Sequence, residues 1–290
     1  MKPPSFLHLQ PASVPEALSM LAEHAPDARI LAGGQSLVPM MNFRLARPAV
    51  LIDINRIPEL AYIKDDGDCL LIGAMTRERA VEDSDLVRQA TPLLHEATTN
   101  IAHLPIRSRG TIGGSISNAD PAAEYPATVL ALDCTLVARS VRGERRVAAA
   151  DFFEGVLTTA LEPDEMLTEI VVPKAPPAAG WASVEISRRH GDFALAGVAA
   201  QILLDGDAVT EIRLAACGVG PGPVRLVGAE AVLLREGLSE ASMRNAGRAA
   251  AAEVDPDGDA HATAAYRRRL AGVMTMRAVA KAAGKAWQTA

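Results

Sequence analysis

Aromatic residues and cysteines are both scarce in this sequence. Phe, Tyr and Trp together make up 3% of the 290 residues, so Ala, Val, Leu and Ile must build most of the core. The three cysteines, Cys69, Cys134 and Cys217, lie far apart and form neither a CxxC pair nor an even-numbered framework. We therefore predict reduced thiols in a cytoplasmic protein, packed as small hydrophobic side chains rather than used as ligands.

Excess basic charge and long apolar runs are missing as well. The formal net charge is −6, which argues against binding to nucleic acid or to an anionic membrane surface. No apolar stretch reaches the ~20 residues that span a bilayer, and the N-terminal MKPPSFLHLQPAS lacks the apolar core of a signal peptide. We expect no membrane span, and any phosphate-bearing ligand must be held by local groups.

Several catalytic motifs are also lacking. The sequence has no GxxxxGKS/T, no GxGxxG after a strand, no HExxH and no GxSxG, which disfavours a Walker-type nucleotidase, a Rossmann domain, a metal site and a serine nucleophile. Residues 217–223 begin like a dinucleotide fingerprint, but Pro223 stands where its third glycine belongs, so a loop is predicted there. No residue qualifies as a general acid, base or nucleophile.

Hydrophobic periodicity outlines the elements. Residues 11–25 predict a helix, because Ser13 is a good N-cap and apolar residues recur at helical spacing behind it. Residues 205–207, Asp-Gly-Asp, predict a turn between two strands. Further helices are predicted at 79–87, 93–102, 127–132, 229–234, 240–254 and 262–285, and strands at 29–32, 50–54, 69–72, 135–138, 169–172, 181–187, 195–204 and 211–217. Three prolines between residues 172 and 180 predict a domain boundary near residue 176.

Two glycine-rich passages carry the main functional signal. They read Gly33-Gly34-Gln35-Ser36 and Gly110-Thr111-Ile112-Gly113-Gly114-Ser115. Consecutive amides without Cβ obstruction form nests that bind anions, so each passage is predicted to offer several N–H donors, and two facing nests could clamp a pyrophosphate. The alternative, that both are ordinary tight turns, stays open on the residues alone.

The two passages, at this separation, resemble those of the FAD-binding medium subunits of the carbon monoxide dehydrogenase and xanthine dehydrogenase family. The similarity extends through residues 51–55, 72–76, 151–153, 165–170 and 191–194, so it covers nearly the whole chain. The resemblance implies an α+β protein: a PCMH-type FAD-binding domain at residues 1–176, with α+β subdomains at about 1–56 and 57–176, and a C-terminal CO dehydrogenase flavoprotein-like domain of antiparallel sheet and helices at 177–290.

The resemblance also implies the residues that contact FAD. The two loops would hold the pyrophosphate and adjoining sugar groups, Glu124 the adenosine ribose, and Leu167 the flavin or adenine. Phe193 would cover the isoalloxazine ring, with a core phenylalanine as the alternative. A lysine common in the family is replaced here by Glu185, and no histidine in the first loop invites covalent attachment, so FAD is expected to be non-covalent. The implied contacts are Leu31, Ala32, Gly33, Gly34, Gln35, Ser36, Leu37, Ala102, Gly110, Thr111, Gly113, Gly114, Ser115, Ser117, Glu124, Leu167 and Phe193.

The function implied by the resemblance is electron transfer. FAD would receive electrons from a [2Fe-2S] cluster on a small partner subunit and pass them to an external acceptor, while molybdopterin on a large partner subunit would act on the substrate, in a dimer of heterotrimers. The apolar residues 104–106 suggest a docking surface for the small subunit, with a buried core segment as the alternative. A self-contained FAD-dependent oxidase or reductase and a non-catalytic module remain the competing functions.

Overall fold

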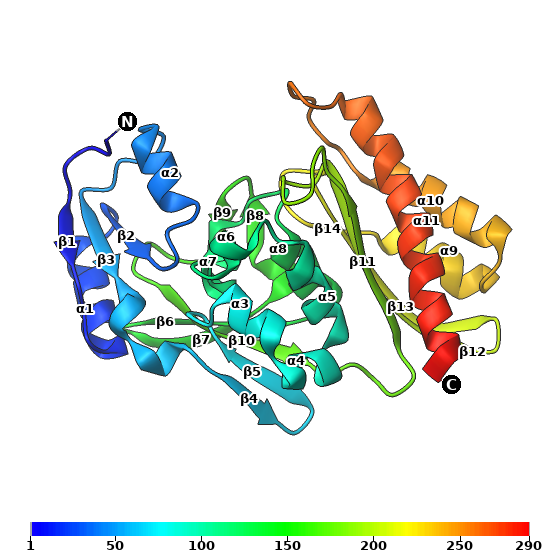
Figure 1. Cartoon of the computed structure of the whole chain (residues 1–290), viewed down its shortest axis with the longest axis horizontal. Coiled ribbons are helices and arrows are strands. Elements are labelled where there is room, and N and C mark those ends of the chain that lie inside the picture. The colour runs from blue at the N-terminus through cyan, green and yellow to red at the C-terminus, as the bar shows by residue number, and fades with distance from the viewer. Residues whose placement is uncertain (1, 290) are drawn as a thin grey trace.

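The computed structural model describes residues 2–289, with side chains to residue 284. Three sheets of three or more strands follow one another along the chain, from a small N-terminal unit through a central unit to a C-terminal unit (Figure 1). Among the described residues no helix is both long and apolar enough to cross a membrane.

The N-terminal unit is a parallel sheet with one long helix. Its strands run in the order β1 (Leu7–Leu9), β3 (Val50–Asp53) and β2 (Ala28–Leu31). Helix α1 (Val14–His24) begins at Ser13, whose hydroxyl accepts from the amide of Glu16, and it buries its apolar stripe against the sheet. Helix α2 (Leu37–Asn42) follows the first glycine-rich loop. Short 3-10 helices at Ile54–Arg56 and Pro58–Leu60 lead out of the unit.

The central unit is an antiparallel sheet covered by short helices. The strand order is β4 (Ile63–Asp66), β5 (Cys69–Gly73), β10 (Met166–Pro173), β6 (Thr135–Ser140) and β7 (Gly143–Ala148). Its helices are α3 (Glu78–Asp83), α4 (Asp85–Ala90), α5 (Pro92–Asn100), α6 (Leu104–Arg107), α7 (Ile112–Asn118) and α8 (Glu124–Ala131). A 3-10 turn at Ala149–Asp151 leads into the hairpin β8 (Phe153–Gly155) and β9 (Thr158–Thr159).

The C-terminal unit is a second antiparallel sheet, in the order β11 (Gly180–Ile186), β12 (Ala196–Asp205), β13 (Ala208–Cys217) and β14 (Val224–Arg225). Helix α11 (Ala264–Thr289) covers β11 and β12, while α9 (Val227–Glu236) packs on β13 and α10 (Glu240–Glu253) on α9 and α11. The opposite face of the sheet contacts α5 and α8 of the central unit. The sheet thus lies between two helical layers (Figure 1).

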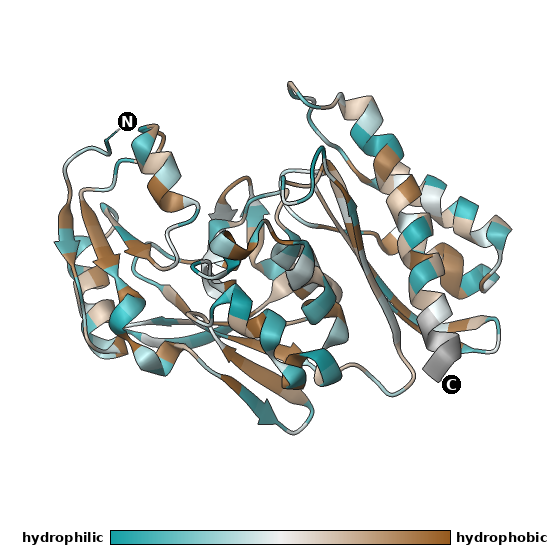
Figure 2. Ribbon diagram, viewed as in Figure 1, coloured by the Kyte–Doolittle hydropathy of each residue, from teal (hydrophilic) through white to brown (hydrophobic). Residues whose placement is uncertain are grey.

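Side-chain alternation along β12 explains that layering. Val198 and Ala200 face the C-terminal helices, whereas Ala199 between them belongs to the core of the central unit. Both faces of β12 are therefore apolar at these positions, and Figure 2 shows brown and pale segments along the strands of this sheet beside teal ones. Small residues on the inner face let α8 approach closely, so the two halves share one continuous contact.

Most predicted elements are confirmed, with one correction. The predicted helix at 79–87 is two helices, α3 and α4, because Ser84 ends the first and caps the second, its hydroxyl accepting from the amide of Val87. The strands β1, β4 and β7 and the helices α2, α6 and α7 were not predicted. Residues 174–179 form no helix or strand, and the domain boundary near residue 176 stays a prediction.

Candidate functional site

The first glycine-rich loop leaves β2 and enters α2. Within the part of the chain that the structure describes, the backbone amides of Gly33, Gly34, Gln35, Ser36 and Leu37 donate to no protein acceptor. Gly34 has a φ of +74°, which reverses the chain, and these residues are all partly exposed. Five consecutive amides without a protein acceptor are therefore available to bind an anion such as a phosphate group.

The second glycine-rich passage is the start of a helix rather than a nest. Thr111 caps α7, and its hydroxyl accepts from the amide of Gly114 at 3.1 Å. The amides of Ile112 and Gly113 donate to the carbonyls of Thr76 and Ala74. The prediction that this passage offers several free amides is therefore wrong, because capping and the neighbouring segment consume them.

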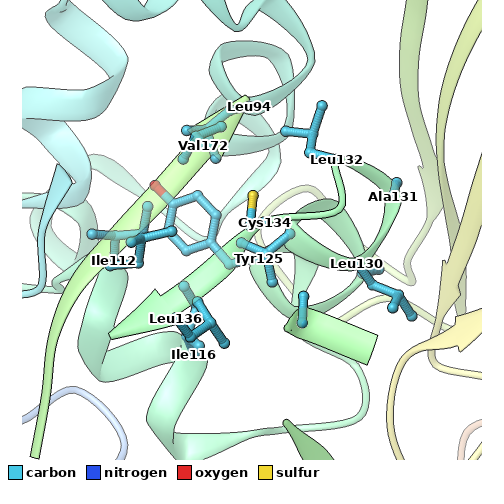
Figure 3. Packing of buried hydrophobic residues seen from close by; sticks show 14 of the residues in the cluster. Leu94, Ile112, Ile116, Tyr125, Leu130, Ala131, Leu132, Cys134, Leu136 and Val172 are labelled. Carbon is cyan, nitrogen blue, oxygen red and sulfur yellow. The ribbon is translucent and has the colours of Figure 1, made fainter. Parts of the chain in front are cut away.

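Helix α7 is anchored in the central core by two of its own side chains, which lie one helical turn apart. Ile112 and Ile116 are fully buried and lie beside the ring of Tyr125 in the central core, as Figure 3 shows. Ser115 and Ser117 are both partly exposed, and because they are two residues apart they project from different sides of α7. The second passage can therefore offer a ligand hydroxyl groups.

The two passages touch each other directly. A Cβ on Gly33 would overlap the carbonyl oxygen of Arg109 and would come within 2.8 Å of the Cα of Gly110. A Cβ on Gly114 would lie 3.5 Å from the Cβ of Ala32. Glycine is required at position 33 because the backbones of the two loops pack against one another.

A polar bridge of Asn55 and Arg77 ties the loops together. The Asn55 side-chain amide donates to the Ala32 carbonyl at 2.7 Å and accepts from the Arg77 guanidinium at 2.7 Å. Arg77 also donates to the Arg109 carbonyl. Neither residue was predicted as part of the site, although Asn55 directly follows the predicted strand at 50–54 and Arg77 lies between β5 and α3.

The segment before β12 approaches the central unit near Ala102. Gly191, with a φ of +84°, packs so closely on His103 that a Cβ would come within 2.7 Å of its Nδ1. Ala102 itself has a φ of +41°, and its carbonyl accepts from Arg107. Phe193 is 63% exposed, so the alternative of a core phenylalanine is wrong.

A buried and a partly exposed carboxyl group, Glu124 on α8 and Glu185 on β11, lie in the same region. Glu124 and Glu185 line the same small cavity, together with Gly197 and Cys217. Burial, and then the charge of Glu185, raises the pKa of Glu124 to about 8, while burial raises the pKa of Glu185 to about 7. Glu124 is therefore a neutral carboxyl at neutral pH in this cavity. Its contact with a ribose stays a prediction.

The remaining predicted contacts differ in accessibility. Leu167 lies in β10, is 4% exposed and belongs to the central core, which leaves little of it for a ligand.

Leu104 is 50% exposed and Ile106 36%, so the buried alternative for the 104–106 segment is wrong. Residues 218–223 form the predicted loop after β13, whose last residue is Cys217. No group of three or more His, Cys, Asp or Glu residues among those described could hold a metal ion.

Comparison with known proteins decides the family. Residues 4–175 match the FAD binding domain in molybdopterin dehydrogenase, and residues 181–282 match the CO dehydrogenase flavoprotein C-terminal domain. The chain belongs to the FAD-binding medium subunits of the carbon monoxide and xanthine dehydrogenase family. It is thus an FAD-binding oxidoreductase subunit of the molybdenum hydroxylases, as its resemblance implied.

Individual relatives of this medium subunit cover its full length. The caffeine dehydrogenase subunit beta of Pseudomonas sp. (strain CBB1) is 42% identical over 98% of this chain and 97% of its own. The carbon monoxide dehydrogenase medium chain of Hydrogenophaga pseudoflava is 40% identical over 96% and 97%. The solved structure of that organism's carbon monoxide dehydrogenase superimposes with a TM-score of 0.96 at 41% identity, covering 98% of this chain and 99% of the other.

Removing the bridge in this medium subunit is expected to weaken FAD binding. Arg77→Met loses two charge-assisted hydrogen bonds between the loops, a change of about 1.5–3 kcal/mol, which corresponds to roughly a three- to tenfold higher Kd if half of it falls on the bound form. Titration of the deflavinated full chain with FAD measures the effect. Arg79→Met is the matched control, because the ion pairs of Arg79 within the described part of the chain are to Glu82 and Asp83 on its own helix. Equal losses in both variants would contradict a role for the bridge.

Proposed function

We propose that this chain is the electron-transfer subunit of a molybdenum hydroxylase, holding non-covalent FAD between the two glycine loops. The observation that carries the proposal is the row of five partnerless amides in the first loop, packed directly against the second loop. FAD, when bound, supplies the change between one-electron and two-electron transfer. The protein's own residues bind and orient it.

Each part of the site would hold a different part of the cofactor. The free amides of residues 33–37 would donate to the pyrophosphate and stabilise its charge without a lysine. The hydroxyls of Ser115 and Ser117 fit sugar or ribityl oxygens. Phe193 exposes a ring face that fits the isoalloxazine. These assignments, with the domain limits 1–176 and 177–290, belong to the proposal.

The partners are also proposed. A small subunit would bring a [2Fe-2S] cluster to the flavin and a large subunit would carry molybdopterin, in a dimer of heterotrimers. Relatives named as a medium chain or as a subunit of a dehydrogenase complex support this arrangement. The 290 residues hold three cysteines, one fewer than the four thiolates of an ordinary [2Fe-2S] centre.

The purified full chain tests the proposal. Its absorption spectrum, and the flavin content of the supernatant after denaturation, are expected to show one releasable FAD per chain, with no oxidation of small-molecule substrates by the chain alone. A colourless chain that cannot be reconstituted with FAD would overturn the proposal. Rapid substrate-dependent dye reduction without partners would favour a self-contained oxidase or reductase.

A further inference from the structure

Glu78 is a buried carboxyl group directly beneath the second glycine loop. It is the first residue of α3 and is 4% exposed, and its amide donates to the Gly110 carbonyl at 3.0 Å. A Cβ on Gly110 would lie 2.5 Å from the Glu78 Oε2, so the carboxyl occupies the space that a side chain would fill. Oε2 is buried and has no hydrogen-bond partner among the described residues.

The nearby cations are committed to other acceptors. The Arg107 guanidinium, whose charge acts most on Glu78, donates to Glu82 at 2.9 and 3.1 Å and to the carbonyls of Ile101 and Ala102. The Arg77 guanidinium is used in the bridge. The charged and titratable groups around Glu78 are Arg107 on α6, Arg77 and Arg109 next to the loops, Arg79 and Glu82 on its own helix, and Glu124 and Tyr125 on α8.

We propose that Glu78 takes up a proton when FAD binds, so that its neutral form is the one that retains the cofactor. A docked pyrophosphate places negative charge on the other side of the same loop backbone, and an ionised, unpartnered Glu78 would oppose it across a region of low dielectric. Glu78 is thereby a positioning residue of the FAD site rather than a catalytic one. The inference rests on the proposed location of FAD at the two loops.

The direction of the pH dependence follows from linkage. Burial raises the pKa of Glu78 to about 7 in the free protein, and bound FAD raises it further. Below pH ~7 Glu78 is protonated in both states and FAD affinity is constant. Between the two pKa values the bound form holds the extra proton, so the Kd rises with pH, by up to about tenfold per unit. Above both values the Kd is constant again.

Calorimetric titration of the deflavinated full chain with FAD, from pH 6 to 9 in buffers of different ionisation enthalpy, measures affinity and proton uptake together. The wild-type chain is expected to take up as much as one proton near pH 8 and to show the rising Kd. Glu78→Gln is expected to bind FAD normally at pH 6 and to show neither effect. The exposed Glu23→Gln is expected to behave like the wild type, and Glu124→Gln, which removes the other buried carboxyl group near the site, is measured beside Glu78→Gln for loss of the same two effects.

Two outcomes overturn the inference. In the first, the Glu78→Gln chain keeps the wild-type rise of the Kd with pH and the wild-type proton uptake. In the second, both effects are lost in Glu124→Gln and kept in Glu78→Gln. If Glu78→Gln does not fold, difference infrared spectra of the wild-type chain decide, because FAD binding at pH 8 must convert a carboxylate signal into a protonated carboxyl signal. No FAD binding by any chain at any pH would instead overturn the proposed function.

Discussion

Replacing Gly33 with alanine is expected to leave a folded chain that has lost most of its FAD. The added Cβ would overlap the Arg109 carbonyl and approach the Cα of Gly110 to 2.8 Å, so the two glycine loops must separate. Overpacking of this kind typically costs about 1–3 kcal/mol. If the cost falls on the FAD-bound form, its upper end corresponds to roughly a hundredfold higher Kd. Flavin content and FAD titration of the full chain measure the loss.

Gly155→Ala is the matched control for this prediction. A Cβ at Gly155 meets no atom within 4 Å, and its φ is not in the left-handed region, so its flavin content should equal that of the wild type. A Gly33→Ala chain with full FAD occupancy would show that the loop contact does not position the cofactor. A Gly33→Ala chain that fails to fold would show that the overpacking destabilises the loops themselves, and not only the FAD-bound form.

Replacing Arg267 with methionine is expected to lower the free energy of unfolding by about 3 kcal/mol. Arg267 on α11 is 8% exposed and donates to the carbonyls of Leu195 and Gly218 at 2.9 and 3.0 Å. Its removal leaves two buried acceptors unpaired, each of which costs about 1–3 kcal/mol. Denaturant unfolding followed by circular dichroism measures the change.

The neighbouring Arg268→Met separates this effect from a general loss of charge on α11. Arg268 pairs with the highly exposed Asp255, an interaction expected to contribute about 0–1 kcal/mol. Equal destabilisation by the two substitutions would contradict the assignment of the effect to the buried carbonyls. The Leu195 carbonyl lies two residues after Phe193, so flavin content should also be compared in the two variants.

Elements with local signals were predictable from the sequence. Ser13 predicts the start of α1, because it is a good N-cap placed before an apolar stripe. Gly206 predicts the hairpin between β12 and β13, and its φ of +58° is one that glycine readily adopts. The break between α3 and α4 was missed because Ser84 suits both a helix interior and an N-cap. Only the structure shows that its hydroxyl caps α4.

The two loops of the site were predictable from the sequence, but their hydrogen bonds and their contacts with other segments were not. The glycine spacing identified both passages, yet it could not show that the amides of the second are consumed by Thr111, Ala74 and Thr76. The contributions of Asn55, Arg77 and Glu78 arise from contacts between segments 20 or more residues apart. Such pairs leave no periodic or local signature in a single sequence.

The glycine contacts bear on how this protein can diverge. Gly33, Gly110 and Gly113 each lie against protein atoms, namely the second loop, the Glu78 carboxyl and Ala74. A descendant that stopped using flavin would keep these glycines for as long as it kept the fold. Its first permitted change would come at Ser36, whose hydroxyl makes no capping hydrogen bond to α2, whereas the Gln35 side chain donates to the Gly33 carbonyl. Loss of flavin in this lineage would therefore be recorded in the residues between the glycines and not in the glycines themselves.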